Sequence, residues 1–142
     1  MTTLVIKRTG PIFKPGVPKR VIDRHLNGAV RDLTEMGEER LAKTLRARPA
    51  GVFLSVRQAR PGRATTGHYR RSVSSRVEHL AARISDGGVI YGPWLEGTGS
   101  RNKTTRFKGY ASFRRVGQWL ERQKRRVLHA HARRIVRDLG GR

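Results

Sequence analysis

Two long stretches of the chain repeat apolar residues at helical spacing, one near each end. In residues 19–48 the apolar positions recur at steps of three and four, at Ile22, Leu26, Ala29, Leu33, Met36, Leu41 and Leu45. In residues 110–139 one helical face is marked by Phe113, Val116, Leu120, Val127, Leu128, His131, Ile135 and Leu139, all apolar except the histidine. Pro49 follows the first stretch and Gly140 the second, and both residue types commonly stop helices. The pattern therefore predicts two long helices.

Between these helices the apolar runs are shorter and carry turn residues at their ends. Four runs are typical of strands, at residues 51–57, 69–77, 79–85 and 89–96. The sequence Asp86-Gly87-Gly88 separates the last two and favours a tight hairpin. We therefore expect an α+β fold, in which an antiparallel β-meander of about four strands has both long helices packed on one face.

The first eighteen residues differ from the rest. A short apolar run, Leu4 to Ile6, is followed by three prolines at positions 11, 15 and 18. Proline removes a backbone donor and disfavours both helix interiors and central strands. We predict an extended N-terminal arm over residues 1–18, and a single α+β domain over residues 19–142. Within that domain, residues 97–109 have no apolar period and are expected to form a basic loop.

The composition adds a strong positive charge. Lys and Arg number 32 against 10 Asp and Glu, which gives a net charge of +22 over 142 residues. Such a field attracts polyanions and repels other copies of the same chain. Apolar residues make up 36%, below the usual ~45–50%, so the core is expected to be thin or completed by a neighbouring subunit. No apolar run is long enough for a signal peptide or a membrane span, which predicts a chain made in the cytoplasm without membrane contact.

Catalytic and metal-binding patterns are weak in this sequence. His129 and His131 are two residues apart, and on a helix such positions point in different directions. Ser72, Ser74 and Ser75 have no neighbouring acid that would orient a base. We predict no enzyme activity, no metal and no cofactor. A small ribonuclease toxin, which can work with Arg, Lys and His alone, stays open as an alternative.

The stretch YGPWLEGTG, residues 91–99, concentrates aromatic, glycine and acidic residues in a basic chain. Pro93 lacks the donor that a central strand requires, which predicts that residues 89–96 lie at a sheet edge. Two interpretations of Trp94 and Glu96 remain open. Either they close the core within one subunit, or they contact a neighbouring subunit.

Several sequence features occur together in a characteristic order. TGHYRRSV at 66–73 precedes YGPWLEGTG at 91–99, and a basic loop and a long C-terminal helix follow. Over about residues 20–139 this order is similar to the tail-completion, or neck, proteins of long-tailed bacteriophages, which join the head to the tail. The family often carries an aromatic residue between the glutamate and the glycine, whereas Gly97 here follows Glu96 directly.

The resemblance implies a non-enzymatic virion protein that forms a ring, with six-fold symmetry, and docks on connector and tail-tube proteins. It implies a subunit or partner interface formed by Tyr91, Trp94, Glu96, Gly97 and Thr98. It also implies a basic loop facing the lumen or a partner, with contact to genomic DNA, formed by Arg101, Lys103, Arg106 and Lys108. The alternative is a basic nucleic-acid-binding protein, because nine cations lie on the polar face of residues 110–139.

Overall fold

The computed structural model describes residues 10–46 and 67–140, and in this part the chain is mostly helical. The elements in chain order are a short 3₁₀ helix η1 (Pro11–Phe13), α1 (Val17–Arg46), α2 (His68–Ser72), β1 (Ser74–Glu78), β2 (Ala81–Ser85), α3 (Gly92–Glu96), α4 (Arg101–Thr104) and α5 (Ser112–Gly140). The two long helices predicted from the apolar periodicity are confirmed as α1 and α5.

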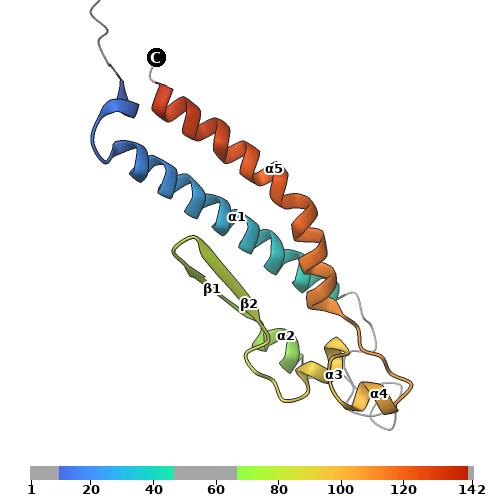
Figure 1. Cartoon of the computed structure of the whole chain (residues 1–142). Helices are drawn as coiled ribbons and strands as arrows, with labels where there is room; N and C mark the ends of the chain where they lie inside the picture. The colour runs from blue at the N-terminus through green and yellow to red at the C-terminus, as the bar shows by residue number, and fades with distance from the viewer. Residues whose placement is uncertain (1–9, 47–66, 141–142) are drawn as a thin grey trace, which may run out of the picture.

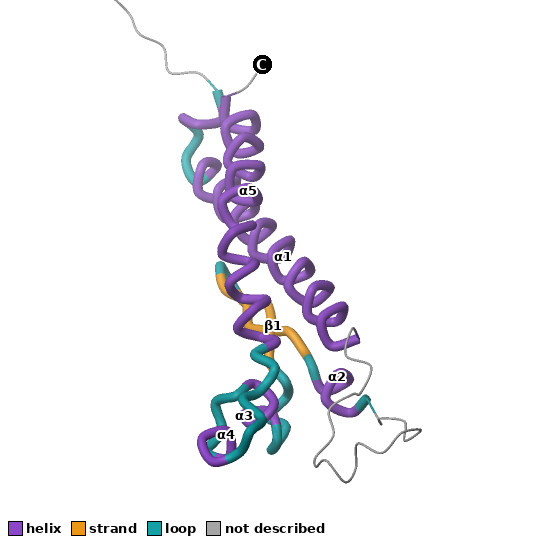
Figure 2. Tube along the Cα trace, turned by 90° about the vertical axis from the view of Figure 1, so that its right-hand side faces the viewer, coloured by secondary structure: helices purple, strands orange, loops and turns teal. Residues whose placement is uncertain are grey.

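Helices α1 and α5 lie side by side and antiparallel along most of their length (Figure 1). The contacts show the direction, because His25 meets Asp138 near the start of α1, whereas Gly37 meets Leu120 further along. The short helix η1 lies at the end where α1 begins and α5 finishes, and it contacts both. Elements α3 and α4 lie at the opposite end, as a second view also shows (Figure 2). The molecule is therefore elongated.

Gly37 of α1 lies where three elements meet. A Cβ at this position would lie 2.7 Å from Cδ1 of Ile84 in β2 and 3.0 Å from Cδ1 of Leu120 in α5. Both distances are shorter than van der Waals contact, so the missing side chain makes room for the two neighbours. Gly28, nearer the start of α1, has the same role, because a Cβ there would lie 2.9 Å from Cε1 of His131. Close packing of the two helices thus depends on small residues in α1.

Two histidine–aspartate pairs join the helices. His131 of α5 is 5% exposed, and its Nε2 lies 2.9 Å from Oδ2 of Asp32 in α1. His25 of α1 lies 2.8 Å from Oδ2 of Asp138 in α5. The two imidazole rings meet edge to face, with their centroids 6.0 Å apart. The helix interface therefore carries polar contacts in the half where α1 begins and α5 ends, and the buried His131 is held there by the solvent-exposed carboxylate of Asp32.

The sheet is a single antiparallel hairpin beside α1. Glu78 pairs with Ala81 across a two-residue turn, and Ser74 pairs with Ser85 at the open end. The turn is fastened to α1 because the backbone N–H of Leu80 donates to Oδ1 of Asn27 at 2.9 Å. All five residues of β1 are exposed, so one strand of the hairpin contributes little to the core.

The predicted four-stranded meander is wrong for the described residues, which contain one two-stranded sheet. Of the predicted strands, residues 79–85 contain β2, and residues 69–77 divide into α2 and β1. Residues 89–96 contain α3 instead of an edge strand. The reason is Pro93, which lies in the first turn of α3, where its missing N–H costs nothing and its fixed φ suits a helix.

Two further expectations change with this topology. The long helices do not share one face of a sheet, because they pack on each other and the hairpin lies against α1. The tight turn of the hairpin is at residues 79–80 and not at residues 86–88. The predicted strand at 51–57 and residues 1–9 of the predicted arm lie outside the described residues. The later part of that arm contains η1, and α1 begins at Val17.

The pair between His25 and Asp138 predicts a pH effect on stability. The hydrogen bond to His25 lowers the pKa of Asp138 below its ordinary value of 3.8, although partial burial opposes this shift. A carboxyl with a lower pKa in the folded state stabilises the fold above its unfolded pKa, and this contribution is lost as pH falls through the folded pKa. We expect the thermal midpoint to decrease below about pH 4, and Asp138→Asn to make that decrease shallower. Thermal unfolding followed by circular dichroism at stepped pH measures both, and identical profiles for the two proteins would contradict the assignment.

Candidate functional site

Residues 91–113 fold into a compact turn at the start of α5, here named the 91–113 turn. Its centre is Asn102, which is 4% exposed although it lies in the predicted basic loop. The Asn102 amide donates to the carbonyl oxygens of Trp94 at 2.9 Å and Phe107 at 3.0 Å. Its own oxygen accepts from the N–H of Gly99 at 3.1 Å. One buried amide thus ties three backbone segments together.

Aromatic packing reinforces this turn. The ring of Phe107 lies between Trp94, at a centroid distance of 4.7 Å, and Tyr110, at 4.9 Å. Leu95 is only 1% exposed. Aromatic pairs at these distances stabilise by roughly 0.5–1.5 kcal/mol beyond their buried area. Trp94 therefore has a packing role within the subunit, and its ring is half-buried.

Two glycines allow the two ends of the turn to touch. Gly97 ends α3 with φ +84°, and Gly109 has φ +86°, both in the left-handed region that favours glycine. A Cβ on Gly97 would collide with the carbonyl oxygen of Lys108, and a Cβ on Gly109 would collide with the backbone nitrogen of Gly97. Glycine is therefore needed at positions 97 and 109 for this crossing.

Glu96 caps the start of α5. The backbone N–H of Phe113 donates to both carboxylate oxygens of Glu96, at 3.2 and 3.1 Å. The residue before α5 is Ala111, which has φ +51° and no side-chain acceptor to serve as a cap. A carboxylate at a helix start satisfies free N–H groups and interacts favourably with the helix dipole. The single glutamate of this basic segment therefore replaces a local N-cap from 17 residues away.

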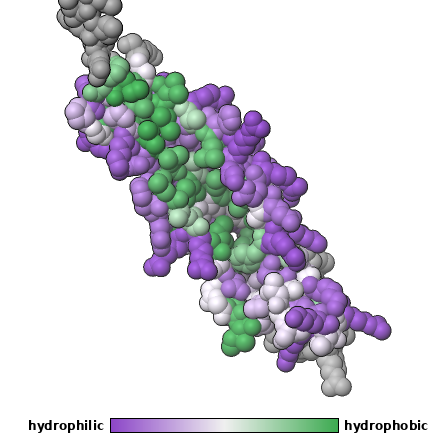
Figure 3. Space-filling model, in the orientation of Figure 1, coloured by the Kyte–Doolittle hydropathy of each residue, from purple (hydrophilic) through white to green (hydrophobic). Residues whose placement is uncertain are grey.

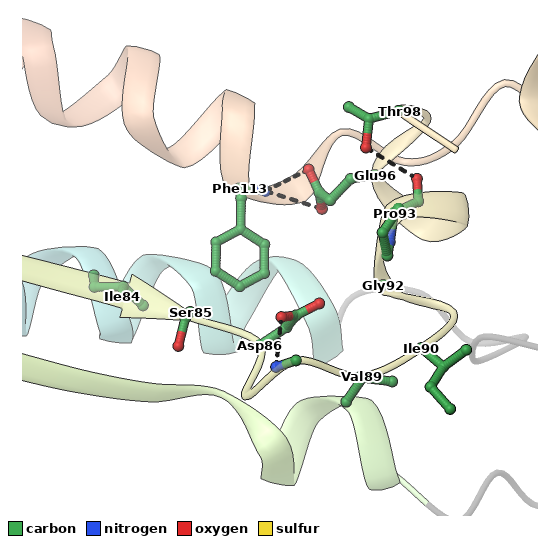
Figure 4. Close-up of a pocket in the computed structure, with 11 residues that line it drawn as sticks. Ile84, Ser85, Asp86, Val89, Ile90, Gly92, Pro93, Glu96, Thr98 and Phe113 are labelled. Atoms are coloured by element: carbon green, nitrogen blue, oxygen red, sulfur yellow. Dashed lines mark hydrogen bonds between the residues drawn. The ribbon is translucent and has the colours of Figure 1, made fainter. Parts of the chain in front are cut away.

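Beside this cap lies a groove of about 430 Å³, here named the α3 groove (Figure 4). The residues that shape it come from the end of β2, the segment before α3, α3 itself and the start of α5, and they include Ile84, Asp86, Val89, Ile90, Glu96 and Phe113. Figure 4 shows the ring of Phe113 pointing from α5 toward the end of β2. The side chain of Ile90 at its edge is almost wholly in solvent, since the residue is 98% exposed.

The α3 groove is acidic, although the chain as a whole is strongly basic. Asp86 and Glu96 line it, and none of the described residues that line it is a Lys or Arg. Among the described residues, neither carboxylate forms a salt bridge. The carboxylate of Asp86 accepts the N–H of Gly88, at 3.1 Å. The groove thus combines apolar walls with two negative charges that have no cationic partner in this part of the chain.

Tyr69 of α2 lies close to the same two carboxylates. It is 5% exposed, and its hydroxyl has no hydrogen-bond partner among the described residues. Burial raises the pKa of this hydroxyl, and the negative charges of Glu96 and Asp86 act in the same direction. The hydroxyl therefore stays neutral at physiological pH. Its ring packs against Gly92, which lines the groove from α3.

The predicted site residues do not form one surface. Tyr91 packs toward α2, with its ring 6.1 Å from that of Tyr69, whereas Trp94 faces Phe107. Thr98 is exposed and its hydroxyl donates to the carbonyl oxygen of Pro93 at 3.3 Å. The four cations of the predicted basic loop are all exposed, namely Arg101, Lys103, Arg106 and Lys108. Of these, Lys108 donates to the carbonyl oxygen of Asn102 at 2.9 Å.

A second surface runs along the paired helices. Figure 3 shows hydrophobic residues gathered in a stripe from the η1 end of the molecule, with hydrophilic residues on both sides. The exposed large hydrophobic residues of η1, α1 and α5 are Ile12, Phe13, Ile22, Leu128 and Val136. All nine Lys and Arg residues assigned to the polar face of α5 are also exposed. The helices thus present both an apolar and a cationic surface.

Searches for related molecules add nothing to these observations. No family model, curated protein or solved structure matches this chain. Across residues 10–46 and 67–140, no helix has the length and apolar character needed to cross a membrane. The same residues contain no group of three His, Asp or Glu side chains that could hold a metal ion. The candidate functions therefore depend on the chain's own surfaces.

The close contact between Gly97 and Gly109 predicts that a methyl group added at Gly97 strongly lowers the stability of the fold. Gly97→Ala should lower the free energy of unfolding by about 2–4 kcal/mol, because it adds an unfavourable φ and a backbone collision. Gly16→Ala is the matched control, since Gly16 has φ +72° and nothing within 4 Å of its Cβ position. Urea denaturation of both variants checks this, and equal losses would show that the crossing does not constrain the fold.

The capping role of Glu96 predicts a graded series. Glu96→Ala should cost about 1 kcal/mol of stability, and Glu96→Gln less, because glutamine keeps one acceptor for the N–H of Phe113. Glu121→Ala serves as the control, since this exposed glutamate pairs only with Lys124 on the surface of α5 and should change stability by at most about 0.5 kcal/mol. Chemical denaturation measures the series, and a Glu96→Ala variant as stable as the control would exclude the cap.

Proposed function

We propose that this chain is a structural assembly subunit of the neck or tail of a long-tailed bacteriophage. In this role it forms an oligomeric ring with its own copies and joins connector and tail proteins, without catalysing a reaction. The observation that carries the proposal is the amount of apolar surface that one copy leaves uncovered. The choice of a phage assembly is supported by the sequence order of the TGHYRRSV and YGPWLEGTG motifs.

One copy leaves several large hydrophobic side chains in solvent. Eight hydrophobic residues are buried in the described part, and eight large hydrophobic residues are exposed there. Three of the exposed ones, Val77, Leu80 and Ile90, belong to the hairpin and to the segment that leads to α3. Contiguous exposed apolar surface with a polar rim is typical of protein–protein contacts. A second copy or a partner that covered these residues would complete a core that the single chain leaves thin.

The charge sets a condition on such an assembly. Copies that each carry +22 repel one another unless salt, nucleic acid or acidic surfaces offset the repulsion. The exposed cations of α4 and the segment after it, including Arg101 and Arg106, are available to acidic partners. A ring around a DNA channel would supply one source of negative charge, and acidic connector or tail surfaces would supply another.

Sedimentation velocity of the full chain over a range of concentrations, in about 0.5 M salt, tests the proposal directly, because this salt screens most surface repulsion. We expect a discrete species several times heavier than 16.1 kDa, either alone or after addition of the cognate connector or tail proteins. A 16.1 kDa monomer at every concentration that also fails to bind those proteins would contradict the proposal.

Nucleic-acid binding is the second candidate, and the exposed cations of α5 favour it. Charged contacts to phosphates make affinity fall with salt, with a slope of about 0.9 for each phosphate neutralised on duplex DNA. If α5 carries the binding, replacing Arg122, Arg126 and Arg133 by Ala should reduce that slope by roughly two to three. The matched control replaces three exposed arginines of other elements, Arg70, Arg76 and Arg83. Equal slopes for both triple variants would exclude a dedicated binding face on α5.

A further inference from the structure

We propose that the α3 groove of one copy binds the segment Leu4–Arg8 of a second copy, so that the subunits join head to tail. This inference rests on the proposed function, because it names the contact that would build the assembly. The occupant is a second copy of this chain, and its binding segment has the sequence Leu-Val-Ile-Lys-Arg.

The chemistry of the groove and of this segment is complementary. The groove has apolar walls that include Ile84, Ile90 and Phe113, and it carries the carboxylates of Asp86 and Glu96. The segment offers three apolar side chains followed directly by two cations. Partly buried carboxylates pair well with Lys and Arg, and apolar side chains gain by leaving water. Binding would cover Ile90, the most exposed large hydrophobic residue of the described chain, and would give both carboxylates a cationic partner.

Geometry rules out the same contact within one copy. Gly10 and η1 lie at the end of the molecule where α5 finishes, whereas the groove lies beside Phe113 at the start of α5 (Figure 1). The 29 residues of α5 separate these ends by about 43 Å at 1.5 Å per residue. Leu4 precedes Gly10 by six residues, which span at most about 22 Å when fully extended. The segment therefore cannot reach the groove of its own chain.

The same distance makes the contact self-propagating. The segment is joined to Gly10 at one end of the molecule and the groove lies at the other, so each contact leaves one segment and one groove unused for further copies. Such heterologous contacts close into rings when the rotation between subunits permits, and otherwise extend into filaments. The arrangement also places two cations of one copy on two carboxylates of the next. It thereby offsets part of the repulsion between highly positive subunits.

Thiol cross-linking of the full chain tests this contact, because the natural sequence has no cysteine. One protein carries Ile6→Cys and a second carries Ile90→Cys, and the mixture is treated with a short bis-maleimide cross-linker. We expect the cross-linked pair to form several-fold more than in a mixture of Ile6→Cys with Val136→Cys. Val136 is the matched control, since it is 70% exposed but lies near the opposite end of the molecule. Equal yields in the two mixtures would overturn the proposal.

Charge exchange supplies an independent readout. Lys7→Glu with Arg8→Glu in the Ile6→Cys protein should abolish the excess of cross-linked product, because both cations of the segment are then replaced by carboxylates. Adding Asp86→Lys to the Ile90→Cys protein should restore its cross-linking to the protein with the altered segment. The same change should abolish its cross-linking to the protein with the natural segment. If the excess survives the double substitution of the segment, the assigned charge pairing is wrong.

The two proposals fail in different ways. An assembly of normal mass that cross-links no more through Ile90→Cys than through Val136→Cys contradicts the head-to-tail contact and leaves the proposed function standing. A chain that stays monomeric, shows no excess cross-linking and binds no connector or tail protein contradicts both. Sedimentation of the same cysteine variants before cross-linking separates these results.

Discussion

The close packing of α1 on α5 is the constraint on which the other elements depend. Gly28 and Gly37 let the helices approach, and the buried His131 of α5 is hydrogen-bonded to the exposed Asp32 of α1. Among residues 10–46 and 67–140, two long helices and one hairpin surround this contact, so the core that these residues form is thin. Apolar positions of η1, α1 and α5 that face away from the contact therefore remain in solvent. The incomplete core and the proposed assembly follow from the same architecture.

The 91–113 turn fixes the position of α3, and so of the α3 groove, relative to the start of α5. Glu96 caps α5, Asn102 fixes the backbone of the turn, and the crossing at Gly97 brings α3 against the segment before α5. The start of α5 thereby positions one wall of the α3 groove, and Asp86, the residue after β2, lies on the other. A glutamate that first stabilises its own subunit also gives the groove its negative charge. Structural and interface roles of Glu96, which the sequence left as alternatives, are thus compatible.

The sequence predicts features that depend on neighbouring residues better than features that depend on contacts between distant residues. A helical period sustained over some thirty residues is a local signal, so both long helices are correctly predicted. The prediction of an edge strand at the short helix α3 is wrong. Pro93 near its start and Gly97 after its end are residue types that commonly begin and stop helices. The groove depends on tertiary contacts between residues 84–98 and Phe113, and the local sequence around Asp86 indicates only a turn. No local pattern signals that Asn102 is buried.

The central claim is that this chain covers its exposed apolar surfaces by joining other copies, chiefly at the α3 groove. Amide hydrogen exchange of the full chain, measured by mass spectrometry below and above the concentration at which it assembles, tests this most directly. The account predicts added protection in peptides that cover residues 4–8 and 84–96, with little change in the middle of α5. Protection confined to the cationic face of α5, or no change with concentration, would contradict it.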